Sequence, residues 1–292
     1  MSNSFRVFLV FGIAVSCLTS LGNASVLEPT LNWDAAEDSS GQYWDSKFNG
    51  AGLNQHNNRR WDFGAGNGAA DDASGSNFGA ITKSYDDKAK MRDFQSNGLS
   101  PDPTKQNATF ELVFRPDDFS DKHYIFETGG EHDGTAIWLD GDQLTLRVQN
   151  LSATGDPQKT ITTTLDTAGI FYDILFTIGV STDEIRLYVN GSLMASGGFS
   201  GDGNLKDWAG GDDSGLSNIG GGGVAGGSGG DFQGDVAIMR YYRNDILDQS
   251  EIDGNFAAMQ AIPEPSSIAM WSALGIIGLV VARRKRKLTR AA

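Results

Sequence analysis

Residues 171–191 read FYDILFTIGVSTDEIRLYVNG and indicate the fold most clearly. The first half of this stretch, Ile174–Val180, is almost continuously apolar, which favours a central strand buried on both faces. In its second half every other residue from Ile185 to Val189 is apolar, and this two-residue period indicates a half-buried strand. Asn190-Gly191 then predicts a tight hairpin turn, because both central residues of such a turn need positive φ. The stretch therefore predicts antiparallel β structure.

The same pattern recurs along the rest of the chain. Large apolar residues occupy every second position within Phe110–Phe114 and Leu144–Val148, and Asp140-Gly141-Asp142 marks a second hairpin. One segment favours a helix, because Asp248 resembles an N-cap with its partner Glu251 three residues later, which predicts a short helix to about Gln260. Many short strands with Gly-rich turns and almost no helix predict an all-β fold, an antiparallel jelly-roll sandwich.

The charge of the chain excludes one class of partner. The sequence has 37 acidic and 23 basic residues, and its formal net charge is −14. Residues 25–262 alone hold 36 acidic and 16 basic residues, a net charge of −20. A surface this acidic repels phosphate backbones, so we expect no nucleic-acid binding.

The N-terminus predicts export. Residues 1–24 combine Arg6, an apolar run from Val7 to Val15, and small residues at Gly22 and Ala24, as a secretory signal peptide does. Cys17, the single cysteine of the chain, lies in this leader. The rest of the chain therefore has no disulfide, no thiolate metal site and no cysteine nucleophile.

The C-terminus has three parts in order. Pro263, Glu264 and Pro265 precede a short apolar stretch, Ile268–Ala282. A helix of that length spans roughly 22 Å, less than a hydrocarbon core of ~30 Å. A basic cluster follows, which would stay on the cytoplasmic side of a membrane. Its residues are Arg283, Arg284, Lys285 and Arg286.

This arrangement resembles the PEP-CTERM sorting segment of exported bacterial proteins, here over residues 263–288. The resemblance implies export by the Sec machinery, a transient stay of the C-terminal helix in the inner membrane, and recognition by an exosortase that removes the tail. It also implies a Gram-negative-type envelope and an exopolysaccharide matrix. A plain single-pass transmembrane anchor is the alternative interpretation of the same residues.

The order of the strand-like segments between residues 105 and 260 resembles that of LamG-like, concanavalin A-like lectin/glucanase jelly rolls. The segments that carry it are Ala108–Phe119, His123–Gly130, Thr135–Val148, Phe171–Gly191 and Phe232–Ile252. We expect one such domain over residues 25–262, in which residues 25–104 supply the first strands and a long rim loop. A separate small domain in residues 25–104 is the alternative.

No residues of this chain match a catalytic motif of the glucanases. Their paired carboxylates stand on one strand, whereas the nearest pattern, Glu251-Ile252-Asp253-Gly254-Asn255, falls on the predicted helix and lacks the third carboxylate. We therefore expect no enzymatic activity. Three tryptophans on expected rim loops, Trp44, Trp61 and Trp208, are candidates to stack on sugars.

A calcium site is the one cofactor that the sequence suggests. Asp212, Asp213 and Asp231 lie on either side of the glycine run Gly220–Gly230, and LamG-like domains often hold Ca²⁺ at the rim. These carboxylates could supply part of a six- to eight-oxygen shell. A solvated acidic face is the alternative, and we interpret the glycine run itself as a flexible loop.

The sequence thus predicts an exported bacterial surface or matrix protein whose LamG-like module binds a glycan or a protein without catalysis. Two alternatives stay open: a glycan-active enzyme, either hydrolase or lyase, and a purely structural matrix protein. Two carboxylates facing each other in a groove would favour the enzyme, whereas aromatic residues around a shallow site would favour the lectin-like module.

Overall fold

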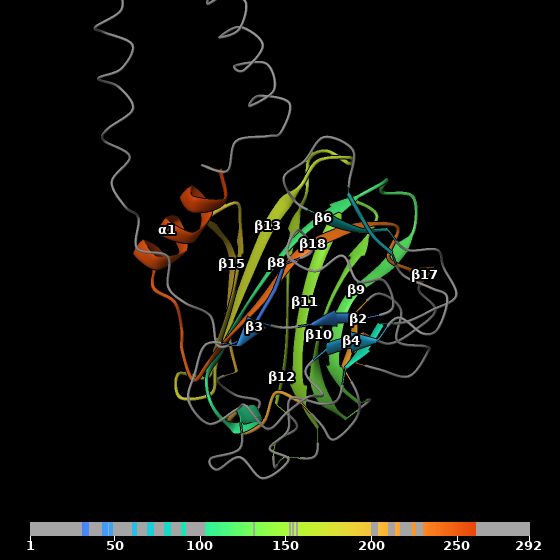
Figure 1. Ribbon diagram of the computed structural model, residues 1–292. Helices are drawn as coiled ribbons and strands as arrows, with labels where there is room; N and C mark the ends of the chain where they lie inside the picture. Colours follow the sequence, from blue (N-terminus) through green and yellow to red (C-terminus); the bar gives the residue numbers. More distant parts are fainter. Residues whose placement is uncertain are drawn as a thin grey trace, which may run out of the picture.

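We describe the fold from a computed structural model of the 292-residue chain (Figure 1). The structure describes residues 31–34, 43–45, 47–48, 60–62, 69–72, 79–82, 89–91, 103–130, 132–151, 153, 155, 157–199, 204–209, 214–216, 224–225 and 230–260. For the strands before residue 103 and for residues 214–216 this description covers the backbone. The predicted signal peptide and sorting segment lie outside the described residues.

The described strands form two sheets, which we call sheet A and sheet B. Sheet A has the order β15-β14-β13-β8-β18-β1-β3, with β6 also paired to β18 and β5 to β6. Its strands are β1 (Leu31–Asp34), β3 (Lys47–Phe48), β5 (Ala69–Asp72), β6 (Gly79–Thr82), β8 (Ala108–Pro116), β13 (Tyr172–Gly179), β14 (Glu184–Val189), β15 (Ser192–Gly198) and β18 (Gly234–Arg243).

Sheet B has the order β12-β11-β10-β9-β16-β7-β4-β2, with β17 also paired to β9. Its strands are β2 (Tyr43–Asp45), β4 (Arg60–Asp62), β7 (Ala89–Met91), β9 (Lys122–Gly129), β10 (Asp133–Asp140), β11 (Gln143–Asn150), β12 (Gln158–Thr164), β16 (Ser214–Leu216) and β17 (Gly230–Asp231). The pairings are antiparallel except for the two-residue β17–β9 contact.

The two sheets enclose a hydrophobic core, which confirms the predicted all-β antiparallel sandwich. Phe110 on β8 packs against Phe176 on β13 with ring centroids 5.1 Å apart, and against Trp208 at 5.3 Å. Strand β13 is buried along its whole length between β8 and β14, as the apolar run of Ile174–Val180 predicted. The first strands expected from residues 25–104 are present as well, and they add to both sheets.

The predicted turns are also confirmed. The hairpin between β14 and β15 turns at Asn190 and Gly191, which have φ of 50° and 78°. The hairpin between β10 and β11 turns at Gly141, with φ of 61°. A 3-10 turn, η1 (Pro103–Lys105), leads into β8.

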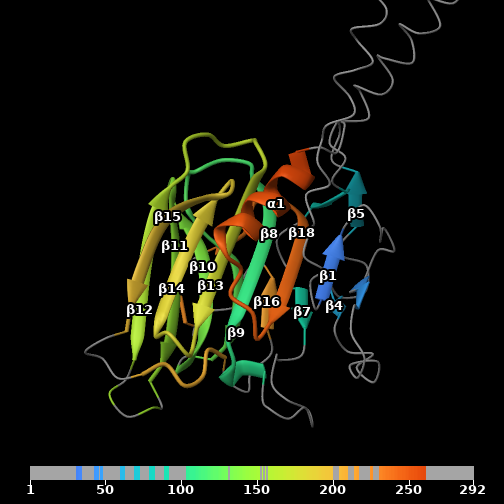
Figure 2. The ribbon, with the colours of Figure 1, turned by 90° about the vertical axis from the view of Figure 1, so that its left-hand side faces the viewer.

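The predicted helix is α1 (Gln249–Gln260), and its N-terminus is a reciprocal capping box. The Asp248 side chain accepts the Glu251 backbone N–H at 3.0 Å, and the Glu251 side chain accepts the Asp248 N–H at 2.8 Å. The helix lies across the outer face of sheet A (Figure 2). There Ile252 packs with Leu175 and Tyr188, so the helix covers this part of the sheet.

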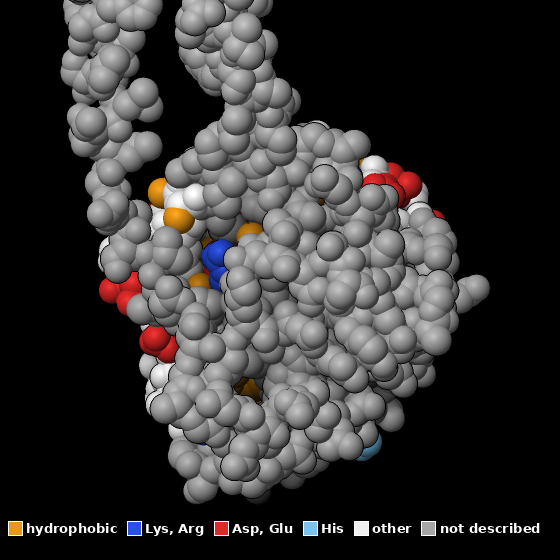
Figure 3. Space-filling view, in the orientation of Figure 1, with side chains coloured by type: hydrophobic (Ala, Val, Ile, Leu, Met, Phe, Trp, Pro, Cys, Tyr) orange, Lys and Arg blue, Asp and Glu red, His pale blue; other side chains and the backbone are white. Residues whose placement is uncertain are grey.

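The acidic surface residues do not gather at one point on the face shown in Figure 3. Among the described residues, acidic side chains lie in separate groups at the left edge and at the upper right. Among the described residues we also find no group of three His, Cys, Asp or Glu side chains that could hold a metal ion. No described helix is long and apolar enough to cross a membrane.

Candidate functional site on the outer face of sheet B

Sheet B carries an unusual set of side chains on the face that points away from the core. On β10 the core side is occupied by Ile137 and Leu139, so Ala136 and Trp138 point outward. The register places Glu127 of β9 and Arg147 of β11 on either side of Ala136. These strands therefore present a mixed aromatic and charged surface.

The next rows complete the surface. Tyr124 of β9 and Thr145 of β11 lie on either side of Trp138, and Lys122 lies opposite Asp140 at the end of β10. The pairing of β9 with β10 contains a β-bulge between Ile137 and Trp138, in which Ile125 is the extra residue of β9. Because of this bulge, Tyr124 lies beside Trp138 on the outer face. We call Lys122, Tyr124, Glu127, Trp138 and Arg147 the outer-face site.

Two cations lie over the indole of Trp138. The Lys122 Nζ is 5.1 Å from the ring centroid and the Arg147 Cζ is 5.3 Å from it. Lys122 is also 5.1 Å from the ring centroid of Tyr124. Such contacts fix the positions of both cations, since each adds about 0.5–1 kcal/mol at partly exposed sites.

The dipeptide Val224–Ala225, from the middle of the glycine run, sits on this site. The Val224 N–H donates to Oε1 of Glu127, while Arg147 Nη1 donates to the Val224 carbonyl at 3.1 Å. Lys122 Nζ donates to the Ala225 carbonyl at 3.2 Å. Three hydrogen bonds therefore hold these two residues of the glycine run on the sheet.

Small residues on β10 make room for the dipeptide. A methyl group at Gly134 would lie 2.5 Å from Cγ2 of Val224 and 2.4 Å from the Thr128 carbonyl, so only glycine fits there. Val224 is buried together with Ala136 and Trp138. Burial of a valine side chain contributes roughly 1.5 kcal/mol, a modest attachment.

The dipeptide also changes the electrostatics of the site. Burial raises the pKa of Glu127 from 4.5 to about 7, although the Val224 N–H and the Lys122 ammonium oppose the shift. Burial lowers the pKa of Lys122 as well, and the nearby Asp140 carboxylate opposes that shift. The site thus contains two cations, Lys122 and Arg147, and one carboxyl, Glu127, that changes charge near pH 7.

This geometry suits binding better than glycoside hydrolysis. Hydrolases need two carboxyls roughly 5–10 Å apart across the scissile bond. On strands β9, β10 and β11, the next carboxyl after Glu127 on this face is that of Asp140. It lies four positions along β10 from the residue opposite Glu127, which is about 13 Å of strand. An aromatic ring with charged hydrogen-bonding groups is, in contrast, what a sugar ring and its hydroxyls require.

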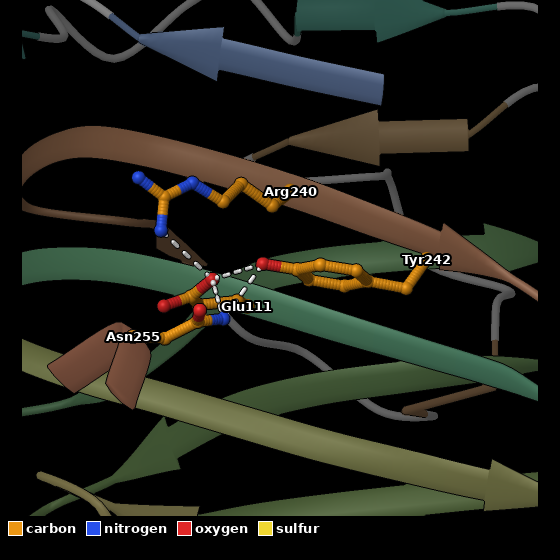
Figure 4. A network of polar contacts seen from close by, with 4 residues as sticks. All are labelled: Glu111, Arg240, Tyr242 and Asn255. Carbon is orange, nitrogen blue, oxygen red and sulfur yellow. Dashed lines mark hydrogen bonds and ion pairs between the residues drawn. The ribbon is translucent and has the colours of Figure 1, made fainter. Parts of the chain in front are cut away.

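A second polar cluster lies on the outer face of sheet A, beneath α1 (Figure 4). Glu111 of β8 is fully buried, and its Oε2 accepts from Arg240 Nη1 at 3.1 Å and from the Tyr242 hydroxyl at 3.0 Å. Asn255 of α1 donates to the Tyr242 hydroxyl at 2.8 Å. These contacts attach the helix to the sheet.

The charge of this cluster is only partly balanced. Burial, and then the neighbouring Glu111, raise the pKa of Asp173 well above its ordinary value. Burial, and then Glu111, also raise the pKa of Tyr242. Because α1 covers the cluster, a polymeric ligand has no access to these carboxyls, and we assign them a structural role.

Of the three tryptophans and three aspartates that the sequence suggested as sugar and calcium ligands, the structure places four. Trp208 is fully buried in the core, and its Nε1–H donates to the Gln106 carbonyl at 2.9 Å, so it does not offer a sugar platform. Trp44 and Trp61 are directly opposite each other in the β2–β4 pair. Asp231 lies in β17, opposite Tyr124 of β9. Asp212 and Asp213 lie outside the described residues.

Sequence reasoning missed the outer-face site. The pattern of β10 marks Trp138 as an outward residue, since it alternates with Ile137 and Leu139. The other signal is Val224, which interrupts an otherwise glycine-rich run. Neither signal shows that the two segments meet.

Comparison with known proteins places the fold in a family. The chain belongs to the concanavalin A-like lectin/glucanases superfamily, whose family model matches residues 87–253. No curated protein matches the sequence.

Solved structures share the fold at low sequence identity. A Trypanosoma rangeli sialidase is 14% identical, with a TM-score of 0.54, over 81% of this chain and 34% of that one. The binding domain of botulinum neurotoxin serotype D is 12% identical, with a TM-score of 0.52, over 82% of this chain and 52% of that one. The chain thus spans about a third and about half of these two proteins.

A carbohydrate-binding module is also similar. The CBM40 module of the Ruminococcus gnavus IT-sialidase, bound to α2,3 sialyllactose, is 14% identical, with a TM-score of 0.46, over 62% of this chain and 96% of that one. At such identities the likeness concerns the fold alone.

Proposed function

We propose that this chain is an exported bacterial surface or matrix protein whose sandwich binds a glycan, without catalysis, through the outer-face site. The observation that carries the proposal is the arrangement around Trp138: an indole with two cations over it, beside the carboxyl of Glu127. Stacking on an aromatic face and hydrogen bonds from charged groups are how proteins hold sugar rings.

Membership of the concanavalin A-like lectin/glucanases superfamily supports a lectin-like role. A sialidase has a similar fold, but the described residues of the outer-face site lack a second carboxyl at catalytic spacing. The proposal therefore assigns binding, with no turnover of the glycan.

Export and sorting form the second part of the proposal. Residues 1–24 would direct export, residues 25–262 would form the binding domain, and residues 263–288 would serve as a PEP-CTERM segment for an exosortase. The sequence resemblance supports this part: a Pro-Glu-Pro triplet, a short apolar stretch and a basic cluster stand in the required order.

A glycan array tests the binding proposal. The full chain and its Trp138→Ala variant are applied to a printed array of neutral and uronate-bearing oligosaccharides. We expect the wild type to bind a subset of these, and Trp138→Ala to lose at least tenfold in affinity because the stacking platform is gone.

Phe171→Ala is the matched control. Phe171 also lies under a cation, with Arg115 Cζ 5.1 Å from its ring centroid, but it packs on sheet A. It should keep the wild-type array profile. Binding that survives Trp138→Ala, or no binding to any sugar, would contradict the proposal.

A further inference from the structure

The outer-face site is occupied by the protein's own backbone. Each of its three charged groups contacts the Val224–Ala225 dipeptide: Glu127 accepts its N–H, and Arg147 and Lys122 donate to its two carbonyls. Trp138 is only 6% exposed, and Tyr124 only 4%. No sugar ring can stack on Trp138 while the dipeptide and the two cations lie against it.

The contacts of the dipeptide match those that a sugar would make. A ring hydroxyl can donate to Glu127 as the Val224 N–H does, and hydroxyl or carboxylate oxygens can accept from Arg147 and Lys122 as the carbonyls do. All three contacts involve main-chain atoms, so the site recognises polar groups rather than a particular side chain. The seat for Val224 at Gly134 and Ala136 is shaped for a small apolar group.

The sequence limits how firmly the dipeptide is attached. Between Gly220 and Gly230, every residue other than Val224, Ala225 and Ser228 is glycine. The apolar attachment within this run therefore comes from Val224 and Ala225. A single substitution at Val224 removes most of it and leaves the sheet untouched.

We propose that Val224–Ala225 is an internal competitor of the glycan, which must leave the outer-face site before a sugar binds. This inference rests on the proposed function. It implies that the measured affinity of the wild type is the intrinsic affinity multiplied by the fraction of molecules in which the site is vacated.

The decisive variant is Val224→Gly in the full chain. It removes the buried side chain while leaving Glu127, Arg147, Lys122 and Trp138 unchanged. We expect at least about tenfold tighter binding to the oligosaccharides that the wild type selects from the array. Val224→Ala should give an intermediate gain, which guards against an effect peculiar to glycine.

The matched control is Ser228→Gly, which adds a glycine to the same run without removing the Val224 contacts. Its affinity should equal that of the wild type. A second measurement needs no ligand. Acrylamide should quench the tryptophan fluorescence of Val224→Gly more strongly than that of the wild type, because Trp138 becomes accessible. A further Trp138→Phe change should abolish this difference. All variants are compared at equal fractions folded, measured by thermal melting.

The outcomes separate this inference from the proposed function. Equal or weaker binding by Val224→Gly, with binding still lost in Trp138→Ala, overturns the internal competitor and leaves the glycan site standing. Tighter binding that Trp138→Ala abolishes supports both. Unchanged acrylamide quenching in Val224→Gly also overturns the inference, because the dipeptide would then not leave the site. Binding that ignores Trp138→Ala, or no binding by any variant, overturns the proposed function and the inference with it.

Discussion

At the scale of single residues, the Glu127 carboxyl both binds the Val224–Ala225 dipeptide and has a raised pKa. The carboxyl lies beneath Val224, where burial raises its pKa to about 7. An ordinary glutamate would be ionised throughout the physiological range, whereas this one changes charge within it. The folded protein therefore holds this proton more tightly than the unfolded chain does.

The sign of the resulting pH effect follows from this difference. The contribution of Glu127 to the free energy of unfolding is fully present below pH 4.5 and is lost as the pH rises through about 7. Over that window it amounts to at most about 3 kcal/mol. The raised pKa of Asp173 acts in the same direction.

Glu127→Gln should flatten this dependence. The amide keeps an oxygen for the Val224 N–H but has no charge to bury, so the variant should lose less stability between pH 5 and pH 8. Urea unfolding of both proteins at pH 5, 6, 7 and 8 measures the difference. Parallel curves would show that Glu127 is not buried as described.

Glu111 illustrates the opposite situation, a buried carboxylate that is paired. Its Oε2 lies 3.1 Å from Arg240 Nη1, and removal of one partner leaves the other charge without compensation. We expect Glu111→Ala to lower the free energy of unfolding by about 3–5 kcal/mol. Glu184→Ala breaks an ion pair whose side chains are 30% and 41% exposed, and should lower it by less than about 1 kcal/mol.

Chemical denaturation of these two variants measures both values. Similar losses for the two would contradict the assigned role of the Glu111 cluster in attaching α1 to sheet A.

At the scale of elements, the β14–β15 hairpin and α1 depend on each other. Gly191 has φ of 78°, and a methyl group there would lie 3.2 Å from the Phe256 ring of the helix. Gln249 of α1 donates to the Gly191 carbonyl at 2.7 Å. The turn residue thus satisfies a backbone requirement and leaves room for the helix.

A comparison of two glycines with the same φ separates backbone strain from the contact with Phe256. Gly169 also has φ of 78°, but a methyl group there would meet no atom within 4 Å. Gly169→Ala should lower the free energy of unfolding by about 1 kcal/mol through backbone strain alone. Gly191→Ala should lower it by at least about 1 kcal/mol more, because the methyl group also presses on Phe256. Equal melting temperatures would rule out the contact with α1.

The elements also show what the sequence can and cannot predict. The strands, both hairpins and the capped helix follow from local rules, namely a period of two, turn residues with positive φ, and an Asp–Glu capping box. Trp208 was expected on an exposed rim loop but is buried in the core. An isolated tryptophan between glycine-rich segments has no neighbouring apolar period from which its burial could be predicted. The outer-face site could not be predicted, because Val224 and Glu127 are 97 residues apart and meet only through the tertiary fold.

At the scale of the whole molecule, the outer faces of the two sheets differ in their described parts. Helix α1 crosses part of the outer face of sheet A, whereas sheet B holds Trp138 and the charged groups around it (Figure 2). The overall charge of −14 disfavours binding of nucleic acids. Local cations at Lys122 and Arg147 counter this charge at the proposed site.

The proposed route to the cell surface makes a prediction about the mature chain. The signal peptide and the segment after Pro263-Glu264-Pro265 should both be absent, because each would be removed during export and sorting. The intact mass of the protein isolated from its native cells tests this directly. A mature form that retains residues 266–292 would contradict sorting and favour a plain membrane anchor.

A crystal structure of the full chain with an oligosaccharide that the array selects would show directly whether the outer-face site binds a glycan. We expect a sugar ring stacked on Trp138, with its oxygens within hydrogen-bond distance of Glu127, Arg147 and Lys122. A sugar bound elsewhere, with the outer-face site unchanged, would contradict this expectation.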